Sequence, residues 1–282
     1  MIDDRTANSQ FKKYLSTYEI IDSGKRVILD INDIRRHSRE LCEFILCDPE
    51  RFIPMAEHEV KRPLGFKGAL GTHFCTPRTI KSSYLQKMVC CEGIVTSVSH
   101  VRPKLRTSVH YDEIKNQFFE KEYRDGTMIE RMPITDTTYP TNFEGRTLIP
   151  EYGLSTYKDF QTIVLQEMPE NAPAGQLPRS LDCVCHEDLA DSVKPGDRIK
   201  VYGIYKTLHG LSHEVPSKFK TVIVINSIER IKIDEVEYGN EESDIEKFLL
   251  LTESPLKFKS IAPTIFGHDN IKIALALQMV GG

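Results

Sequence analysis

The sequence predicts a mixed, mainly β protein: a helical bundle at the N-terminus, followed by a small closed barrel. Three observations predict this fold. Apolar residues early in the chain recur at helical spacing, whereas from Leu85 onward β-branched residues form strand-like runs. Gly93 interrupts the first of these runs, residues 88–99. A long first strand that bends at a glycine is what a small barrel needs in order to close.

Composition excludes several classes of protein. The chain has 282 residues, of which 40% are hydrophobic and 28% charged, as in ordinary globular proteins that form one large domain or a few small ones. No apolar run is long enough to span a membrane, and the polar, acidic start does not resemble a signal peptide. Seven irregularly placed cysteines indicate a reducing compartment. With a net charge of −4, any contact with nucleic acid must come from a local patch.

Residues 1–72 are predicted to form the helical subdomain. An apolar stripe (Phe11, Tyr14, Leu15, Tyr18) predicts a first helix, with Asn8 or Ser9 as its cap. After a short strand at residues 27–31, Asn32 and Asp33 cap a second helix with its own stripe (Ile34, Leu41, Phe44, and Ile45 or Leu46). Asp48 and Pro49 then begin a third helix. The glycine-rich stretch 65–72 is interpreted as a hinge, because no Gly-Lys-Ser/Thr follows it.

The barrel is expected to comprise residues 73–104 and 151–232, interrupted by an inserted block at 105–150. In the first strand the adjacent Cys90 and Cys91 should point to opposite faces. The inserted block alternates apolar and charged residues and contains no cysteine, and its Asp125-Gly126 pair predicts a hairpin turn. We therefore expect a small excursion of two or three strands.

A long loop, residues 166–180, separates the predicted strands 160–165 and 181–186. It reads QEMPENAPAGQLPRS and contains three prolines, which can hold a loop in shape without ladder hydrogen bonds. Loops of this length are usually functional or disordered, and the strong strand signals on both sides argue against disorder. On these grounds alone, a functional element and a plain surface connection both remain open.

The second half of the barrel follows this loop. Cys183, Cys185 and His186 could ligate a metal, but a zinc site would need a matching pair elsewhere, so we interpret them as core. A short helix at 187–193 and strands at 198–206 and 219–228 complete the pattern, the last two joined by a long hairpin, 205–226. Five strands with a bent first strand, one short helix and a long hairpin describe an OB-fold, which often binds oligonucleotides.

Charge divides the end of the chain. Residues 197–232 carry seven lysines and arginines against three acidic residues, whereas 233–246 carry seven acidic residues and no basic one. Residues 233–244 are therefore interpreted as a solvated linker. From 245 a further helical segment begins, with His268 or Asp269 as the cap of its second helix. The chain stops at Gly281-Gly282 directly after an apolar helix, which suggests a truncated domain.

Three of these stretches resemble the minichromosome maintenance (MCM) family of replicative helicase subunits. They are QEMPENAPAGQLPRS, CEGIVTSVSHVRPK and IAPTIFGHDNIKIALALQMVGG, in the family's order and spacing. EYGLSTYKDFQTIV resembles the subunit-three branch of this family. The resemblance covers nearly the whole chain and is weakest over residues 1–65.

The resemblance implies an N-terminal tier: a helical subdomain, an OB-fold and an inserted zinc ribbon, followed by an AAA+ ATPase domain that starts within 245–282. Members with a zinc ribbon carry four cysteines in the insert, and this chain has none there. We therefore expect a ribbon-like shape without zinc, built around a small core (Ile114, Phe118, Phe119, Tyr123). The chain ends before the position of the Walker A loop, so we expect no ATP hydrolysis and no cofactor here. ATP and Mg²⁺ are expected for the full-length protein.

The resemblance also assigns functional residues. The loop at 166–180 would couple the N-terminal tier to the ATPase tier, through a set of seven residues: Gln166, Glu167, Pro169, Pro173, Gly175, Pro178 and Arg179. Sibling subunits bind single strands with basic residues at the positions of Ser97 and Val164. DNA contacts here are therefore expected on the hairpin, to phosphate and without sequence preference: Lys206, His209, His213, Lys218 and Lys220. These could instead be solvated charges.

The implied partners are the other five MCM subunits, with subunits five and seven as neighbours, in a nuclear heterohexamer and head-to-head double hexamer around DNA. No membrane partner is expected. Two alternatives remain. A free-standing OB-fold that binds single-stranded DNA would use aromatic stacking in a basic groove, but the chain has no tryptophan and the hairpin tip has no aromatic residue. A scaffold without a nucleic-acid role is the other.

Overall fold

The computed structural model describes residues 3–17, 21–22, 26–130, 133–135, 140, 142–143, 146–173, 175–208, 219–231 and 264–280. The chain divides into two compact units, Met1–Ile231 and Lys232–Gly282. The first holds the helices, the barrel and the inserted block. Along the described ranges, no helix has the length and apolar character needed to cross a membrane.

The N-terminal part has four helices: α1 (Asp4–Thr17), α2 (Ile31–His37), α3 (Arg39–Cys47) and α4 (Pro49–Val60). The first helix begins at Asp4, so the predicted caps Asn8 and Ser9 lie inside it. The predicted second helix is divided at Ser38, whose backbone is extended and whose hydroxyl accepts a hydrogen bond from the Leu41 amide. A serine in this conformation ends one helix and caps the next. The helix predicted as the third is α4, and it starts at Pro49 as the Asp48-Pro49 pair predicts.

This part is not purely helical. It also contains a sheet of β1 (Ile21–Asp22), β2 (Val27–Asp30) and β3 (Leu64–Lys67), in which β2 and β3 are parallel. Its core, centred on Phe11, Phe52 and Phe66, continues into Met88 and Cys90 of the barrel. The first 72 residues therefore share a hydrophobic core with the barrel and do not form a separate bundle.

Two polar side chains join β3 to the barrel. Asn226 donates from its side-chain amide to the Leu64 carbonyl and accepts from the Phe66 amide. Arg26 pairs with Asp188 at 2.6 Å and also donates to the carbonyls of Leu64 and Asn226. Arg26 and Asn226 are buried. Buried polar groups that find all these partners fix one arrangement of the two parts.

The barrel consists of β5 (Met88–Val98), β11 (Thr156–Gln166), β12 (Ser180–His186), β13 (Arg198–Leu208) and β14 (Lys220–Arg230). The sheet runs β11-β12-β14-β13-β5, and β5 pairs back with β11, which closes the ring. This confirms the predicted barrel. Three short elements, η1 (Gly71–His73), β4 (Phe74–Cys75) and η2 (Ser82–Tyr84), lead into β5. The predicted helix at 187–193 is only a single 3-10 turn, η4 (Glu187–Leu189).

The positions of the cysteines confirm which way their side chains were predicted to point. Cys90 packs in the core shared with the helices, whereas Cys91 packs inside the barrel. Cys183 and Cys185 are also fully buried inside the barrel. Burial raises the pKa of the Cys185 thiol to about 12 and raises that of Cys183 as well. These cysteines are therefore core residues, as interpreted. Among the described residues no cluster of three potential metal ligands occurs.

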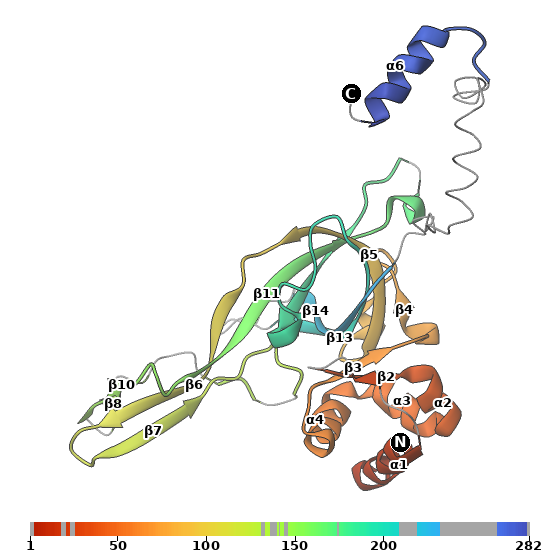
Figure 1. Ribbon diagram of the computed structural model, residues 1–282. Helices are drawn as coiled ribbons and strands as arrows, with labels where there is room; N and C mark the ends of the chain where they lie inside the picture. The colour runs from red at the N-terminus through yellow and green to blue at the C-terminus, as the bar shows by residue number, and fades with distance from the viewer. Residues whose placement is uncertain are drawn as a thin grey trace. The chain divides into compact units, whose positions relative to one another are not determined.

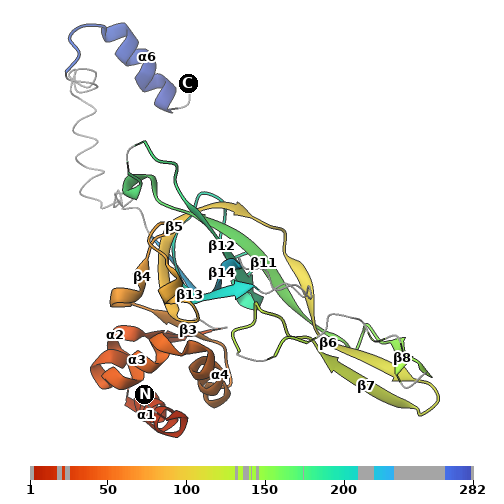
Figure 2. The same cartoon turned by 180° about the vertical axis from the view of Figure 1, so that it is seen from behind.

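The inserted block is built on β6 (Arg102–Asp112) and β7 (Gln117–Glu122), with the short strands β8 (Asn142–Phe143), β9 (Arg146–Thr147) and β10 (Ile149–Pro150). β6 pairs with β11 in its first half and with β7 in its second half. The strand therefore runs unbroken across the predicted boundary between 104 and 105. The β6–β7 hairpin projects from one side of the barrel, and helices α1–α4 are grouped below the barrel (Figures 1 and 2).

Two predictions about this block are wrong. The hairpin turn lies at residues 113–116 and not at Asp125-Gly126. The Asp112 carboxylate accepts hydrogen bonds from the amides of Ile114 and Lys115, and Asn116 adopts a left-handed φ of 51°, so a turn forms here without glycine. Ile114 and Phe118 are not core residues, since they are 75% and 59% exposed. A flat hairpin exposes both faces to solvent, so alternation does not show which face is buried. The buried residues here include Ser108, Val109, His110 and Leu148.

The second unit is described only over residues 264–280. Helix α6 (Asp269–Val280) begins directly after His268, as predicted, and the His268 carbonyl accepts from the amides of Ile271 and Lys272. The predicted linker at 233–244 and the predicted helix that starts at 245 lie outside the described residues.

Candidate functional site

The long loop leaves the barrel between β11 and β12, at the end opposite to the helices (Figures 1 and 2). Gln166 and Ser180 are the last paired residues of the two strands, so the loop proper spans 167–179. Its first limb carries the 3-10 turn η3 (Pro169–Asn171). At the tip, the Gln176 amide donates to the Pro173 carbonyl and Gly175 has a φ of 79°, a conformation that favours glycine. Pro173 and Pro178 are exposed.

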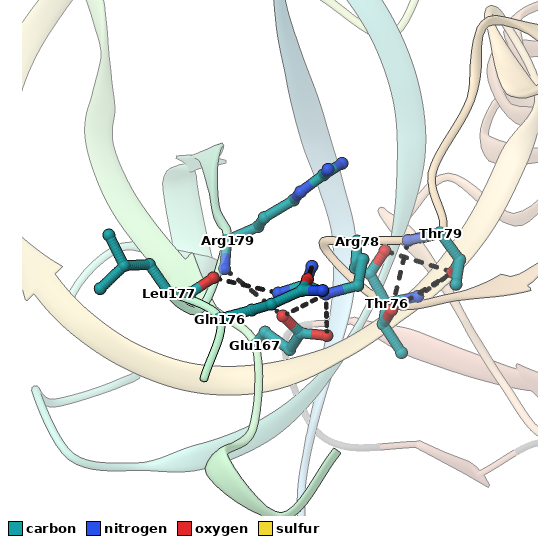
Figure 3. A network of polar contacts seen from close by, with 7 residues as sticks. All are labelled: Thr76, Arg78, Thr79, Glu167, Gln176, Leu177 and Arg179. Atoms are coloured by element: carbon teal, nitrogen blue, oxygen red, sulfur yellow. Dashed lines mark hydrogen bonds and ion pairs between the residues drawn. The ribbon is translucent and has the colours of Figure 1, made fainter. Parts of the chain in front are cut away.

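An arginine from a distant segment holds this loop (Figure 3). The Arg78 Nε lies 3.0 Å from both carboxylate oxygens of Glu167. Its two terminal nitrogens donate to the Gln176 side-chain oxygen at 2.5 Å and to the Leu177 carbonyl at 3.0 Å. One guanidinium therefore bridges the base of the loop and its returning limb.

Glu167 and Arg179 have different environments, although both are predicted as charged contacts of the loop. Glu167 is buried, its amide donates to the Arg179 carbonyl, and the Arg78 guanidinium lowers the pKa of its carboxyl. It therefore stabilises the base of the loop from within. The Arg179 side chain is exposed and points away from this network (Figure 3). Of the two, only Arg179 is placed to contact another surface.

The first limb has an attachment of its own. Glu170, in η3, pairs with Arg198 at 2.7 Å, at the first residue of β13. The Glu170 side chain is 55% exposed, so this pair contributes little to stability. The loop is thus held strongly on the returning limb and weakly on the leading one.

Of the predicted DNA residues of the hairpin, the structure describes Lys206 and Lys220, and these two differ in exposure. Lys206 is buried, where it pairs with Glu50 of α4 and donates to the carbonyls of Met128 and Ile129. This geometry does not support a contact between Lys206 and DNA. Lys220 is 67% exposed and pairs with Asp182 at 2.8 Å. His209, His213 and Lys218 lie outside the described residues.

The sequence of this chain is similar to one family of known proteins. The family profile described as the MCM OB domain matches residues 75–209, which include β5, the inserted block and the loop. A DNA replication licensing factor MCM3 from Oryza sativa subsp. indica is 38% identical over 279 residues, covering 91% of this chain. The relative from Drosophila melanogaster is 39% identical over 93% of the chain, and that from Schizosaccharomyces pombe 36% over 92%.

The chain belongs to the MCM family. The matches cover 36%, 35% and 33% of these three relatives, so the chain spans about a third of the length of the curated relatives it matches. The names of the relatives also confirm the subunit-three branch, to which the stretch EYGLSTYKDFQTIV pointed.

Within this MCM barrel, Ser97 and Val164 are cross-strand partners on β5 and β11. The two positions assigned to basic residues in sibling subunits therefore adjoin on one sheet. Here neither side chain carries a charge. Basic side chains at these two positions would lie next to each other.

Two features of this MCM chain could not be identified from sequence. Arg78 stands 89 residues before Glu167, and the Thr-Pro-Arg-Thr stretch around it indicates a turn but no partner. The second feature is the segment 125–129. It packs against the outer face of the barrel through Ile129 and is held there by three side chains. Lys104 binds Asp125 and Thr127, His186 donates to the Thr127 carbonyl, and Lys206 donates to the next two carbonyls.

Proposed function

We propose that this chain is the N-terminal tier of a subunit of the heterohexameric replicative DNA helicase, with its role in ring assembly, DNA encirclement and coupling to an ATPase tier. The observation that carries this proposal is the loop that projects from the MCM OB barrel and is held from outside by Arg78. Contacts from one arginine of a distant segment hold this loop in a defined shape, which a plain surface connection does not need.

The partners follow from the proposal. They are the other five MCM subunits, with subunits five and seven as neighbours, in a nuclear heterohexamer and a head-to-head double hexamer. DNA passes through the ring and is contacted at phosphates, without sequence preference, during licensing, initiation and unwinding. ATP and Mg²⁺ belong to the ATPase tier of the full-length protein. The insert, which lacks cysteine, would be ribbon-like without zinc.

The gene provides the first test. The full-length reading frame should continue beyond Gly282 into a Gly-x-x-x-x-Gly-Lys-Ser/Thr motif. The second test uses the full-length protein assembled with the other subunits. Replacing residues 169–177 by a flexible Gly-Ser linker should leave assembly and ATP hydrolysis in place and should strongly reduce unwinding per ATP. Wild-type unwinding by this ring would overturn the coupling role.

DNA binding separates this proposal from a free-standing single-strand binder. The 282-residue chain alone should bind single-stranded DNA only weakly at physiological salt, because an encircling subunit acquires its affinity in the ring. Submicromolar binding by the isolated chain would favour the single-strand binder.

A further inference from the structure

The Arg78 side chain starts from a rigid turn. The Thr76 amide donates to the Thr79 hydroxyl at 2.8 Å, and the Thr79 amide donates to the Thr76 hydroxyl at 3.3 Å. Pro77, between Thr76 and Arg78, is buried. Reciprocal bonds of this kind fix the backbone on both sides of the arginine. The backbone of Arg78 is therefore restrained, and the contacts with Glu167, Gln176 and Leu177 hold its guanidinium.

Arg78 holds the returning limb of the loop. In the described part of the loop, which omits residue 174, residues 175–178 hydrogen bond to segments outside the loop only through Arg78. The contacts within the loop are local: Asn171 to Met168, Ala172 to Pro169 and Gln176 to Pro173. Without the guanidinium, the returning limb would keep only its local turn, and the weak pair between Glu170 and Arg198 would hold the first limb.

The chemistry requires an arginine here. The planar guanidinium reaches the two oxygens of Glu167 and, in other directions, the Gln176 side chain and the Leu177 carbonyl. A lysine ammonium is a compact point charge and does not span acceptors in this fixed geometry. Hydrogen bonds from a charged donor are also about twice as strong as neutral ones.

The same contact determines where the Leu177 side chain lies. Its carbonyl is bound by Arg78, and its side chain is 89% exposed (Figure 3). A single exposed leucine is ordinary on a protein surface. This one differs because a charge-assisted hydrogen bond to its own carbonyl fixes its backbone in place. Apolar side chains held ready in this way lose less entropy when they dock.

We propose that Arg78 is the positioning residue of the loop, and that it presents Leu177 as the loop's docking contact for an apolar pocket on the ATPase tier. This inference rests on the proposed function. The pocket would lie in the part of an MCM chain that is outside these 282 residues, since this chain covers only about a third of the length of its relatives. Replacing Arg78 and replacing Leu177 should both reduce coupling between ATP hydrolysis and unwinding. Only the replacement of Arg78 should also loosen the loop.

The test uses the full-length protein in the assembled ring, with three readouts: hydrogen exchange of the loop amides, ATP hydrolysis and DNA unwinding. Arg78→Gln removes the charge and leaves the buried Glu167 carboxylate without a partner, so it could disturb folding. Arg78→Lys is therefore made as well, because it keeps the positive charge and loses only the planar set of donors. Both variants should raise exchange at Gln176, on the returning limb, by about tenfold and reduce unwinding per ATP by a similar factor.

Leu177→Ala should leave loop exchange at the wild-type level and reduce unwinding per ATP to the level of Arg78→Lys. Matched controls are Arg36→Lys, which alters an exposed pair with Asp33, and Leu154→Ala, which truncates another exposed leucine. Both controls should behave like wild type in all three readouts.

The outcomes separate the two proposals. Wild-type loop exchange in Arg78→Lys would overturn the positioning role, and a loosened loop with normal unwinding would overturn the presentation of Leu177. If the Gly-Ser replacement of 169–177 also unwinds DNA normally, the proposed coupling function itself is wrong. If that replacement fails to unwind while Leu177→Ala is normal, coupling stands and the docking contact lies elsewhere.

Discussion

The Lys206 ammonium lies 2.7 Å from a carboxylate oxygen of Glu50, and both side chains are buried. Lys206 stands on β13 near the base of the hairpin, and Glu50 lies in the first turn of α4. The ammonium also donates to the carbonyls of Met128 and Ile129. One lysine therefore joins the helices, the barrel and the inserted block.

Lys206→Ala should destabilise the chain severely. It leaves the Glu50 carboxylate buried without its partner, a change that typically costs about 3–5 kcal/mol. Urea denaturation of the 282-residue chain measures this loss. Lys220→Ala is the matched control, because its exposed pair with Asp182 is worth at most about 1 kcal/mol. A stable Lys206→Ala chain whose assembled ring binds DNA poorly would instead restore Lys206 as a DNA contact.

Lys220 is the predicted DNA residue that the structure describes as exposed. In the assembled ring, Lys220→Ala should weaken binding to all DNA sequences alike and lower the salt slope of log K by about 1. Lys12→Ala removes another exposed lysine, which lies on α1 and pairs with Glu59 of α4, and it should leave the slope unchanged. Asp182→Asn frees Lys220 from its partner, so it should strengthen binding at low salt. An unchanged slope for Lys220→Ala would show that this lysine is only a solvated charge.

Local pattern was sufficient for much of the fold. The opposite faces of Cys90 and Cys91 and the start of a helix at Pro49 depend on neighbours in sequence. The turn of the inserted hairpin was placed wrongly, because the Asp112 side chain and the left-handed Asn116 form a turn where no glycine marks one. Asp125 instead pairs with Lys104 of β6.

The site was harder to predict than the fold, because its contacts join distant segments. The loop was located by its prolines and its resemblance, but the inward position of Glu167 depends on Arg78 in another part of the chain. Likewise, Lys206 is predicted as a hairpin charge, and only packing against α4 and residues 128–129 shows that it is buried. Charge in a sequence indicates a polar contact without indicating its partner.

His186 should make stability depend on pH. Burial, followed by the positive charge of Lys158, lowers the pKa of His186 to about 4, and its Nε2 donates to the Thr127 carbonyl. The unfolded chain binds a proton on this imidazole near its ordinary pKa, so the folded state loses stability as pH falls from about 6.5 towards 4. His186→Gln keeps a donor that does not titrate.

The difference in unfolding free energy between wild type and His186→Gln should therefore shift in favour of the variant between pH 6.5 and 4.5. Taking this difference removes the contributions of carboxylates that titrate in the same window, such as Glu57, whose pKa is raised by burial. Parallel pH profiles for the two proteins would show that His186 titrates normally in the folded state.

Gly93 should tolerate no side chain, because β5 passes close to the base of the loop there. A Cβ at this position would lie 2.4 Å from the Gln166 carbonyl oxygen and 2.9 Å from Leu165 Cγ. Gly93→Ala must therefore push β11 away, at a cost of about 1–3 kcal/mol or more, as for overpacked cores. Because Gln166 is the residue from which the loop starts, the strain should also raise hydrogen exchange at Glu167. Gly153→Ala is the control, since its Cβ would meet nothing within 4 Å. Equal unfolding midpoints for the two variants would mean that β5 and β11 can separate freely at this point, and the loop would then have no rigid base from which Arg78 could orient it.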